Sequence, residues 1–323
     1  MRLISHPVLC NYYVTYRCNA KCHFCDIWEK PSPYITLEDA KANFEDLKKL
    51  GVKVIDFTGG EPLLHQQLHE LLALAKDYGF ITTVTTNALL YPKRAEQLKG
   101  LIDMLHFSLD SFDKEKHDTG RGVACYDKVI ESIDIARSLG ERPDILFTVM
   151  PDNLNEISDV YQKISKPNEL ILILNPIFEY DSIGSQLSTD QLSELKQWGK
   201  KKWIFLNDAL IDLRLDGGNN IHQPVCKAAS SSIVISPKNE LILPCYHLGQ
   251  DHFPIEKNLH TLYNSKKIQA IIPKEGRLPE CDSCTINCYM QPSFSVNINK
   301  YFWKSLSSTF KYNWWKGTWK NLL

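Results

Sequence analysis

Cys18-Asn-Ala-Lys-Cys22-His-Phe-Cys25 is the stretch of this sequence that decides its fold and its chemistry. Its three cysteines lie in a short loop directly after an apolar, strand-like run over residues 8–16. Thiolates at such spacing bind zinc or an iron–sulfur cluster. A structural metal site normally has four protein ligands, whereas three leave one position open for chemistry. The next cysteine is Cys125, so we expect a four-iron cluster that keeps one iron free for a small molecule.

A second motif follows the next strand-like run. Val54-Ile-Asp-Phe57 leads into Thr58-Gly59-Gly60-Glu61-Pro62. Because glycine has no Cβ, the two glycines allow backbone carbonyls to approach a bound ligand closely. The glutamate supplies negative charge near a cationic amine, or near an arginine that orients the turn, and the proline stiffens the turn.

In this order the two motifs resemble the signature of the radical S-adenosylmethionine (SAM) superfamily. The cysteine loop, with aromatic Phe24 before its last cysteine, is similar to the loop that holds the SAM-binding [4Fe–4S] cluster of that family. The Gly-Gly-Glu-Pro turn is similar to the motif that contacts the methionine amine of SAM. The resemblance implies that Phe24 and the turn are cofactor contacts. One alternative stays open from the residues, namely a zinc site with Cys10 or His23 as its fourth ligand.

Length and composition are those of an ordinary globular protein. The 323 residues suffice for a full-sized core, in one large domain or in a large and a small one. Because 37 basic residues face 38 acidic ones, no positive excess favours nucleic acid. No apolar run of about 18 residues is present to span a membrane, and the first residues do not resemble a signal peptide. We therefore expect a cytoplasmic protein whose clustered, reduced cysteines bind metal.

Strand-like and helix-like segments alternate through the first half of the chain. This alternation predicts βαβ units, a parallel sheet and right-handed crossovers. Six such units match the partial (β/α)6 TIM-type barrel of the resembled superfamily. The sequence predicts strands at residues 8–16, 52–57, 80–86, 103–109, 145–149 and 169–174, and helices at 36–50, 66–78, 93–98, 126–139, 154–164 and 189–203.

Polar residues follow the third and fourth predicted strands, at the edge where parallel α/β folds bind their ligands. Asn87 ends the third strand, and Ser108 and Asp110 end the fourth. The resemblance implies that these residues line the ribose and carboxylate of SAM. Local turn or cap roles are the alternative. Arg121 pairs with a carboxylate of SAM or substrate by resemblance, or makes an ordinary salt bridge.

The pattern changes near residue 180, where we place the boundary between a radical SAM core (1–180) and a second domain (181–299). Strand-like runs at 232–236 and 240–243 flank a Pro-Lys-Asn turn and predict a hairpin. The hairpin brings Cys226 near Cys245, and a helix predicted at 258–272 returns the chain to a further cysteine group. The second set of cysteines is Cys226, Cys245, Cys281, Cys284 and Cys288.

This second set is similar to the auxiliary-cluster domains of radical SAM enzymes, called SPASM when complete and twitch when shortened. The complete version has seven cysteines and two clusters, whereas this chain has five. The resemblance implies one auxiliary [4Fe–4S] cluster on Cys226, Cys245, Cys281 and Cys284. Cys288 either replaces one of the last pair or stays free. From the residues alone, structural zinc is the alternative.

Residues 300–323 form a basic, aromatic C-terminal tail with five lysines and no acidic residue. Phe302, Leu306, Phe310 and Trp314 recur at every fourth position, which predicts a helix with one apolar stripe. Lysines interleaved with tryptophan indicate a helix in a lipid interface, hence peripheral membrane contact. Packing of the tail on its own domain or on a partner is the alternative.

The resemblance implies that the cluster reduces SAM to methionine and a 5′-deoxyadenosyl radical, which takes hydrogen from a substrate carbon. It further implies a peptide or small-molecule substrate, an auxiliary cluster that assists electron transfer, and an electron donor such as flavodoxin or ferredoxin. Two alternatives remain: a radical SAM enzyme acting on a lipid-linked substrate at a membrane, and a non-catalytic zinc or iron–sulfur scaffold. The sequence singles out no catalytic side chain.

Overall fold

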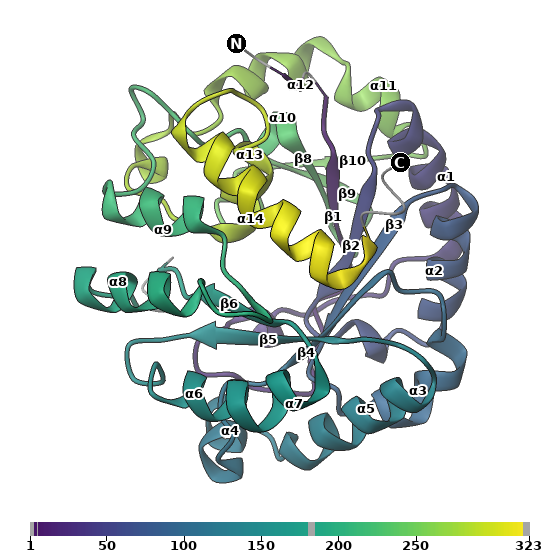
Figure 1. The fold of residues 1–323 in the computed structure, drawn as a ribbon. Helices are drawn as coiled ribbons and strands as arrows, with labels where there is room; N and C mark the ends of the chain where they lie inside the picture. The colour runs from purple at the N-terminus through teal and green to yellow at the C-terminus, as the bar shows by residue number, and fades with distance from the viewer. Residues whose placement is uncertain (1–2, 5, 180–184, 319–323) are drawn as a thin grey trace.

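A single sheet organises the molecule. The computed structural model describes residues 3–4, 6–179 and 185–318, and its strands form one sheet in the order β10-β9-β8-β1-β2-β3-β4-β5-β6-β7 (Figure 1). The strands are β1 Leu9–Thr15, β2 Val54–Gly59, β3 Ile81–Thr86, β4 Met104–Ser108, β5 Asp144–Val149, β6 Leu172–Pro176, β7 Ile204–Phe205, β8 Ser232–Ile235, β9 Glu240–Leu243 and β10 Asp251–Pro254.

Strands β1 to β7 are parallel, and each is joined to the next through at least one helix. Figure 1 shows these helices along the outer side of the curved sheet. The predicted partial β/α barrel is therefore confirmed, with the short β7 as an additional parallel strand. The connecting helices are α1 Leu37–Lys49, α2 Leu68–Asp77, α3 Tyr91–Leu98, α4 Lys114–Arg121, α5 Tyr126–Ser138, α6 Glu156–Val160, α7 Lys166–Asn168 and α8 Thr189–Trp198.

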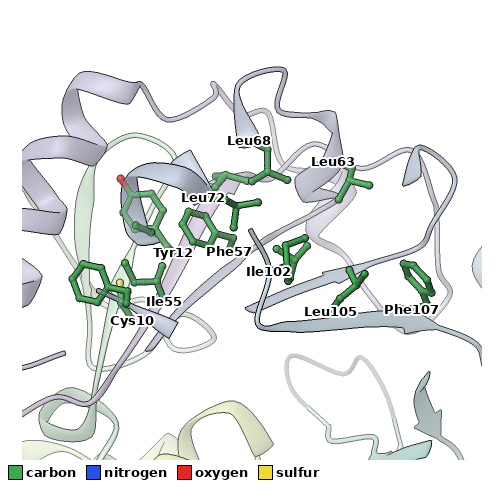
Figure 2. Packing of buried hydrophobic residues seen from close by; sticks show 14 of the residues in the cluster. Cys10, Tyr12, Ile55, Phe57, Leu63, Leu68, Leu72, Ile102, Leu105 and Phe107 are labelled. Carbon is green, nitrogen blue, oxygen red and sulfur yellow. The ribbon is translucent and has the colours of Figure 1, made fainter. Parts of the chain in front are cut away.

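The main hydrophobic core lies between the sheet and the outer helices. Cys10 and Tyr12 of β1 and Ile55 and Phe57 of β2 are fully buried there, with Leu72 of α2 beside them (Figure 2). Successive side chains of a strand point to opposite faces, so alternate residues of each strand supply this apolar layer. The Cys10 thiol is thus part of the core.

The opposite face of the same strands carries polar side chains toward the barrel interior. Asn11 of β1 is paired in register with Asp56 of β2, which is paired with Thr83 of β3. The Thr83 hydroxyl donates a hydrogen bond to the Asp56 carboxylate. Burial raises the pKa of Asp56 to about 6, although the hydroxyl opposes the shift. A polar wall of this kind suits a ligand rather than a filled apolar interior.

The predicted hairpin β8–β9 is continuous with the barrel. Strand β8 pairs with β1 in parallel, from Leu9 opposite Ser232 to Tyr12 opposite Ile235, and β9 and β10 follow in antiparallel order. The second set of cysteines is therefore carried by an extension of the barrel's own sheet. The predicted boundary after residue 180 lies outside the described residues, and the division into domains stays a prediction.

Several predicted helices end or divide where the sequence analysis expected them to continue. The helix predicted at 154–164 consists of α6, a π-helical segment over 161–165 and α7. The helix predicted at 189–203 ends at Trp198, before Gly199. The helix predicted at 258–272 is wrong as one unit, because the Ser265 side chain accepts a hydrogen bond from the Ile268 amide and starts a new helix. Its two parts are α11 Leu259–Tyr263 and α12 Lys266–Ile271.

Other elements were not predicted. Helix α4 has the sequence Lys-Glu-Lys-His-Asp-Thr-Gly-Arg, which lacks an apolar period, and its main local signal is the Asp113 cap that accepts from the Lys116 amide. Strands β7 and β10 are too short for alternation to stand out. Three further helices that were not predicted are α9 Asp208–Leu215, α10 Ala228–Ser231 and α13 Asn287–Ser293, whereas α14 Lys300–Lys316 is the helix predicted in the C-terminal tail.

Helix α14, the described part of the C-terminal tail, packs against α9 and β7. The Tyr312 hydroxyl donates to Asp144 at the start of β5 (2.6 Å), and Lys316 Nζ lies 2.8 Å from the same carboxylate. Lys304 pairs with Asp212 of α9. Charged groups of α14 therefore face the protein. None of the helices in the described part of the chain has the length and hydropathy needed to cross a membrane.

Replacement of Lys316 by alanine should destabilise the protein, because it leaves the buried Asp144 carboxylate without its cation. The Lys316 and Asp144 side chains are 7% and 1% exposed, and removing one partner of a buried pair typically costs about 3–5 kcal/mol. The midpoint of denaturant unfolding, followed by circular dichroism, measures the change. Lys300→Ala on the same helix is the matched control, since its exposed pair with Asp216 is worth at most about 1 kcal/mol. Equal shifts for the two variants would contradict this account of α14.

Candidate functional site

The first cysteine loop begins where β1 ends. Cys18, Cys22 and Cys25 lie within electrostatic reach of one another, and the Cys25 amide donates to the Cys22 carbonyl (3.1 Å) to close a turn. Burial raises the pKa of the Cys18 thiol to about 12, partly opposed by the Ala20 amide that donates to its sulfur. A bound cation would favour the thiolate instead.

The glycine turn at the end of β2 clamps this loop through the backbone. The Gly60 amide donates to the Thr15 carbonyl (3.0 Å), and the Glu61 amide donates to the Arg17 carbonyl (2.9 Å). A Cβ on Gly59 would lie 1.9 Å from the Thr15 oxygen, and one on Gly60 would lie 2.2 Å from the Arg17 oxygen. The close approach that requires glycine here is therefore to the chain's own carbonyls.

Glu61 joins the turn to the end of β3. Its carboxylate, in a residue that is 1% exposed, accepts hydrogen bonds from the Leu63 amide, the Thr86 hydroxyl and the Asn87 amide. Burial raises the pKa of Glu61, while those three donors and the Arg94 guanidinium oppose the rise. Arg94 itself donates to three carbonyls of the segment after the turn, those of residues 63, 65 and 66. Glu61 thus holds the turn in place against the end of β3 through these hydrogen bonds.

Asn87 and the cysteine loop are directly connected. The Asn87 Nδ2 donates to Asn19 Oδ1 at 2.8 Å, one residue after the first cysteine. Three consecutive strand ends, those of β1, β2 and β3, therefore meet at the loop. The predicted cofactor-binding residues Gly59, Gly60, Glu61 and Asn87 are brought together here.

A buried ion pair borders the other side of the loop. Arg121, at the end of α4, lies 2.6 Å from the Asp110 carboxylate and 5.3 Å from the Phe24 ring centroid. Burial raises the pKa of Asp110 against the opposing effect of Arg121. Burial would lower the pKa of Arg121, yet Asp110 and the Cys22 thiol raise it above its usual range. Ser108 is buried at the end of β4, two residues before Asp110.

Helix α4 also holds the loop through its backbone. The Lys21 amide donates to the Arg121 carbonyl (3.0 Å), and the His23 amide donates to the Gly120 carbonyl (3.4 Å). His23 Nδ1 lies 3.1 Å from the same Gly120 oxygen. Cys10 belongs to the hydrophobic core on the outer face of β1, which removes it as a fourth ligand for the loop.

A cavity of about 580 Å³ opens beside the ion pair, and His23 is the one residue of the first cysteine loop in its lining. Its lining holds more carboxylates than cationic side chains, so it favours a cationic ligand. The lining residues are His23, Asp110, Ser111, Asp113, Glu115, Lys116, His117, Thr119, Gly120, Met150, Asp152, Asn153 and Glu156. Asp110 is shared between this cavity and the ion pair.

His117, Asp118 and Cys125 form a compact group whose ligand atoms lie within 4.8 Å of one another. The possible ligand atoms of this group already have partners within the protein. His117 Nδ1 accepts a hydrogen bond from the Asp110 amide, and His117 Nε2 lies 3.4 Å from the Cys125 sulfur. Asp118 accepts from the amides of Cys125 and Tyr126 at the start of α5. This group therefore joins α4 to α5.

The second set of cysteines gathers at the end of the hairpin and the start of α13. Cys226 and Cys245 each act electrostatically on Cys284, which in turn lies within reach of Cys281. Burial raises the pKa of Cys245 to about 12. Cys288 has Asp56 of β2 and Cys284 as its charged neighbours. All five cysteines thus lie in one region, as the sequence predicts.

Aromatic residues connect the two sets of cysteines. Tyr246, which follows Cys245, stacks on Tyr13 with ring centroids 4.5 Å apart and lies 5.7 Å from Tyr16. The Cys25 and Cys245 side chains pack against the same hydrophobic cluster, and Lys30 donates to the Tyr246 hydroxyl at 3.1 Å. Sequence reasoning missed Tyr246, Asn19, Arg94 and Asp56, whose partners are distant in the chain.

Comparison with known proteins agrees with this geometry. Residues 12–164 match the family described as the Radical SAM superfamily. The AdoMet-dependent heme synthase of Nitratidesulfovibrio vulgaris is 28% identical over 57% of this chain and 53% of its own length. The subtilosin biosynthesis protein AlbA of Bacillus subtilis is 24% identical over 94% of this chain and 71% of its own. The chain spans about half the length of several curated relatives it matches.

Two solved structures share the fold. Streptococcus suis SuiB bound to S-adenosylmethionine superposes with a TM-score of 0.68 at 17% identity, over 82% of this chain and 67% of that one. Native anSMEcpe with bound AdoMet superposes with a TM-score of 0.63 at 17% identity, over 95% and 97%. The fold and the three-cysteine loop define a partial β/α barrel with a candidate metal centre at the carboxyl ends of its strands. Residues 12–164 therefore match the radical SAM superfamily, and the relatives named here with an activity are enzymes.

Gly60→Ala should prevent the first loop from binding its metal centre. The added Cβ would lie 2.2 and 2.5 Å from the Arg17 and Tyr16 carbonyl oxygens, so the start of the loop must move. Iron content after anaerobic reconstitution measures the loss. Gly120→Ala is the matched control, since its Cβ meets only the His23 ring at 3.8 Å. Wild-type iron content in Gly60→Ala would show that the clamp is not needed.

Proposed function

We propose that this protein is a radical SAM enzyme that binds S-adenosylmethionine beside the loop of Cys18, Cys22 and Cys25 and removes hydrogen from a carbon of a peptide substrate. The single observation that carries the proposal is the convergence of three strand ends on the three-cysteine loop.

The residues of the loop fit a four-iron cluster. Three thiols lie within electrostatic reach of one another, and Cys10 is excluded as a fourth ligand. When bound, such a cluster supplies the electron that splits SAM into methionine and a 5′-deoxyadenosyl radical. Among the residues that the structure describes, neither set of cysteines brings three sulfur atoms within 4.8 Å of one another. A tetrahedral zinc site with Zn–S bonds of about 2.3 Å needs closer sulfurs, so the spacing favours a larger centre.

The chain's own residues then position the cofactor and exclude water. Glu61 and Arg94 hold the turn whose backbone faces the loop, and Asn87 ties β3 to it. Phe24 and Ser108 belong to the same edge of the sheet and are proposed cofactor contacts. Arg121 remains charged beside Cys22 and Asp110, which places a cation next to the proposed cluster and a partner for a ligand carboxylate.

The second set of cysteines is proposed to hold an auxiliary [4Fe–4S] cluster on Cys226, Cys245, Cys281 and Cys284. Tyr246 and Tyr13 fill the space between this site and Cys25 with stacked rings, which supports electron transfer between the two centres. An external donor of the flavodoxin or ferredoxin class would supply the electrons.

A peptide is the proposed substrate because of the relatives. AlbA, a bacteriocin biosynthesis protein, matches 94% of this chain. Structures of the same fold hold the precursor peptide SuiA and the Cp18Cys peptide. The polar inner wall of the barrel offers hydrogen bonds that peptide groups satisfy.

Anaerobically reconstituted protein should convert SAM to 5′-deoxyadenosine when dithionite is added. Cys22→Ala should abolish this product and lower the iron content from about eight to about four atoms per chain. Chromatography and iron analysis measure both. Cys125→Ser is the matched control, because that thiol contacts His117 and lies outside both proposed clusters.

Each alternative gives a different result. Wild-type protein that binds iron yet yields no 5′-deoxyadenosine would contradict the proposed reaction, and protein that binds no iron would be a zinc or non-metal scaffold. About four iron atoms with one zinc ion would contradict only the auxiliary cluster.

A second candidate, action on a lipid-linked substrate, is favoured by the outer face of α14. Trp303, Leu306, Phe310 and Trp314 are 60%, 49%, 66% and 60% exposed along one side of the helix. Lys300 and Lys304 pair with Asp216 and Asp212 instead of flanking this stripe. Membrane contact would therefore depend on apolar insertion of the stripe, with little contribution from the helix's charges.

The full-length protein should then sediment with neutral phosphatidylcholine vesicles, and one-third anionic lipid should leave the bound fraction nearly unchanged. The double variant Trp303→Ser/Phe310→Ser should lose binding, because it removes two large apolar side chains from the stripe. Lys300→Ala serves as the control on the same helix. Failure of the wild-type protein to sediment, or a strict requirement for anionic lipid, would rule out contact through this stripe.

A further inference from the structure

We propose that Cys288 is a free thiol on the wall of the barrel interior and that it donates a hydrogen atom to carbon radicals formed there. The inference rests on the proposed function, because only that reaction supplies a carbon radical. It assigns a role to the cysteine that a four-ligand auxiliary cluster leaves over.

Cys288 differs in position from the other four cysteines of its set. It lies in the first turn of α13, its residue is exposed, and its first charged neighbour is Asp56 of β2. Cys226, Cys245 and Cys284 instead belong to or pack against one hydrophobic cluster. Cys281 and Cys288 both lie within electrostatic reach of Cys245 and Cys284, so what distinguishes Cys288 is its exposure and its neighbours Asp56 and Tyr13.

Cys288 lies close to residues of β1 and β2, the two strands that lead to the first cysteine loop and to the glycine turn. Its charged neighbour Asp56 lies three positions before Gly59, whose turn clamps the first cysteine loop. Tyr13 and Tyr289 are also within electrostatic reach of the Cys288 sulfur, and both are buried. Cys288 is therefore an exposed residue beside buried residues of the inner strand faces.

A second observation shows that this part of the wall is prepared for a ligand. Asn11, paired in register with Asp56, is only 4% exposed, and its Nδ2 has no hydrogen-bond partner in the structure. A buried donor without a partner costs about 1–3 kcal/mol, which a ligand oxygen would recover. Asp56 beside it accepts from an N–H or O–H group. A polar substrate such as a peptide is therefore held by Asn11 and Asp56 next to the Cys288 sulfur.

The transfer balances in atoms and electrons. The S–H bond of Cys288 breaks homolytically, a C–H bond forms on the substrate radical, and a thiyl radical remains. One electron from the low-potential donor that drives SAM cleavage, of the flavodoxin or ferredoxin class, and one proton from water at the exposed sulfur restore the thiol. The substrate carbon thus regains a hydrogen that comes from the protein.

The first experiment measures whether Cys288 is free. Full-length protein with its iron–sulfur centres reconstituted is treated anaerobically with iodoacetamide, and the labelled cysteines are identified by mass spectrometry. We expect the label on Cys288, with Cys226, Cys245, Cys281 and Cys284 protected. Cys288→Ser should bind as much iron as the wild type. Protection of Cys288 together with a loss of about four iron atoms in Cys288→Ser would identify it as a cluster ligand and overturn the proposal.

The second experiment follows the hydrogen and needs no substrate. In D2O with SAM and dithionite, the 5′-deoxyadenosyl radical takes deuterium from an S–D bond, because thiol hydrogens exchange with solvent and the S–H bond is weaker than the C–H bond that forms. Aliphatic O–H and N–H bonds are too strong to react, whereas a tyrosine O–D bond is weak enough to donate, so the difference between the wild type and Cys288→Ser reports the thiol. We expect deuterium at C5′ of 5′-deoxyadenosine from the wild type, its loss in Cys288→Ser and its retention in Cys125→Ser. Absence of 5′-deoxyadenosine in the wild type would refute the proposed function itself. Formation of 5′-deoxyadenosine with the same deuterium content in Cys288→Ser would refute only the role of Cys288.

Discussion

Two backbone hydrogen bonds, from Gly60 to Thr15 and from Glu61 to Arg17, fix the geometry on which the candidate site depends. They join the ends of β1 and β2 at the point where the first cysteine loop leaves the sheet. On the other side, a Cβ on Gly122 would lie 2.4 Å from the Lys21 carbonyl oxygen, so the end of α4 is equally close. The loop is clamped between two glycine-dependent contacts, which lets three thiols hold one orientation before any metal binds.

The sequence alone predicts the part of this arrangement that rests on local patterns. The parallel strands of the barrel follow from apolar, strand-like runs such as residues 8–16 that alternate with helix-like segments, and the cysteine loop follows from its spacing. The pairing of β8 with β1 does not follow, because it joins segments more than two hundred residues apart and each strand alone reads as an ordinary hairpin strand. The contacts of Asn19 with Asn87 and of Tyr246 with Tyr13 could not be predicted from the sequence for the same reason. In each pair the two residues are distant in the chain, and only the order of the strands in the sheet brings them together. Helix α4 was missed because its residues are charged on all sides.

The pairing of β8 with β1 has a chemical consequence. Because β1 leads into the first set of cysteines and the β8–β9 hairpin leads into the second, one strand pair sets the distance between the two proposed metal centres. Tyr13 and Val234 on the inner side of this pair belong to a single hydrophobic cluster with Cys226, and Cys25 packs against it. Movement of one centre relative to the other would therefore require the sheet itself to deform, which close packing resists.

Helix α14 shows how the sequence pattern of a surface helix can be misread. Its lysines interleaved with tryptophan predict a helix in a lipid interface, yet Lys316 and Tyr312 meet at the buried Asp144 carboxylate and Lys304 meets Asp212. Each apolar side chain left outside forgoes roughly 25 cal/mol for every Å² that it would otherwise bury. Rotating the helix to bury them would leave Asp144, at 1% exposure, without a cation, and an unpaired buried charge costs more than an exposed leucine or phenylalanine gains. The carboxylate at the start of β5 therefore decides which face of the last helix remains exposed.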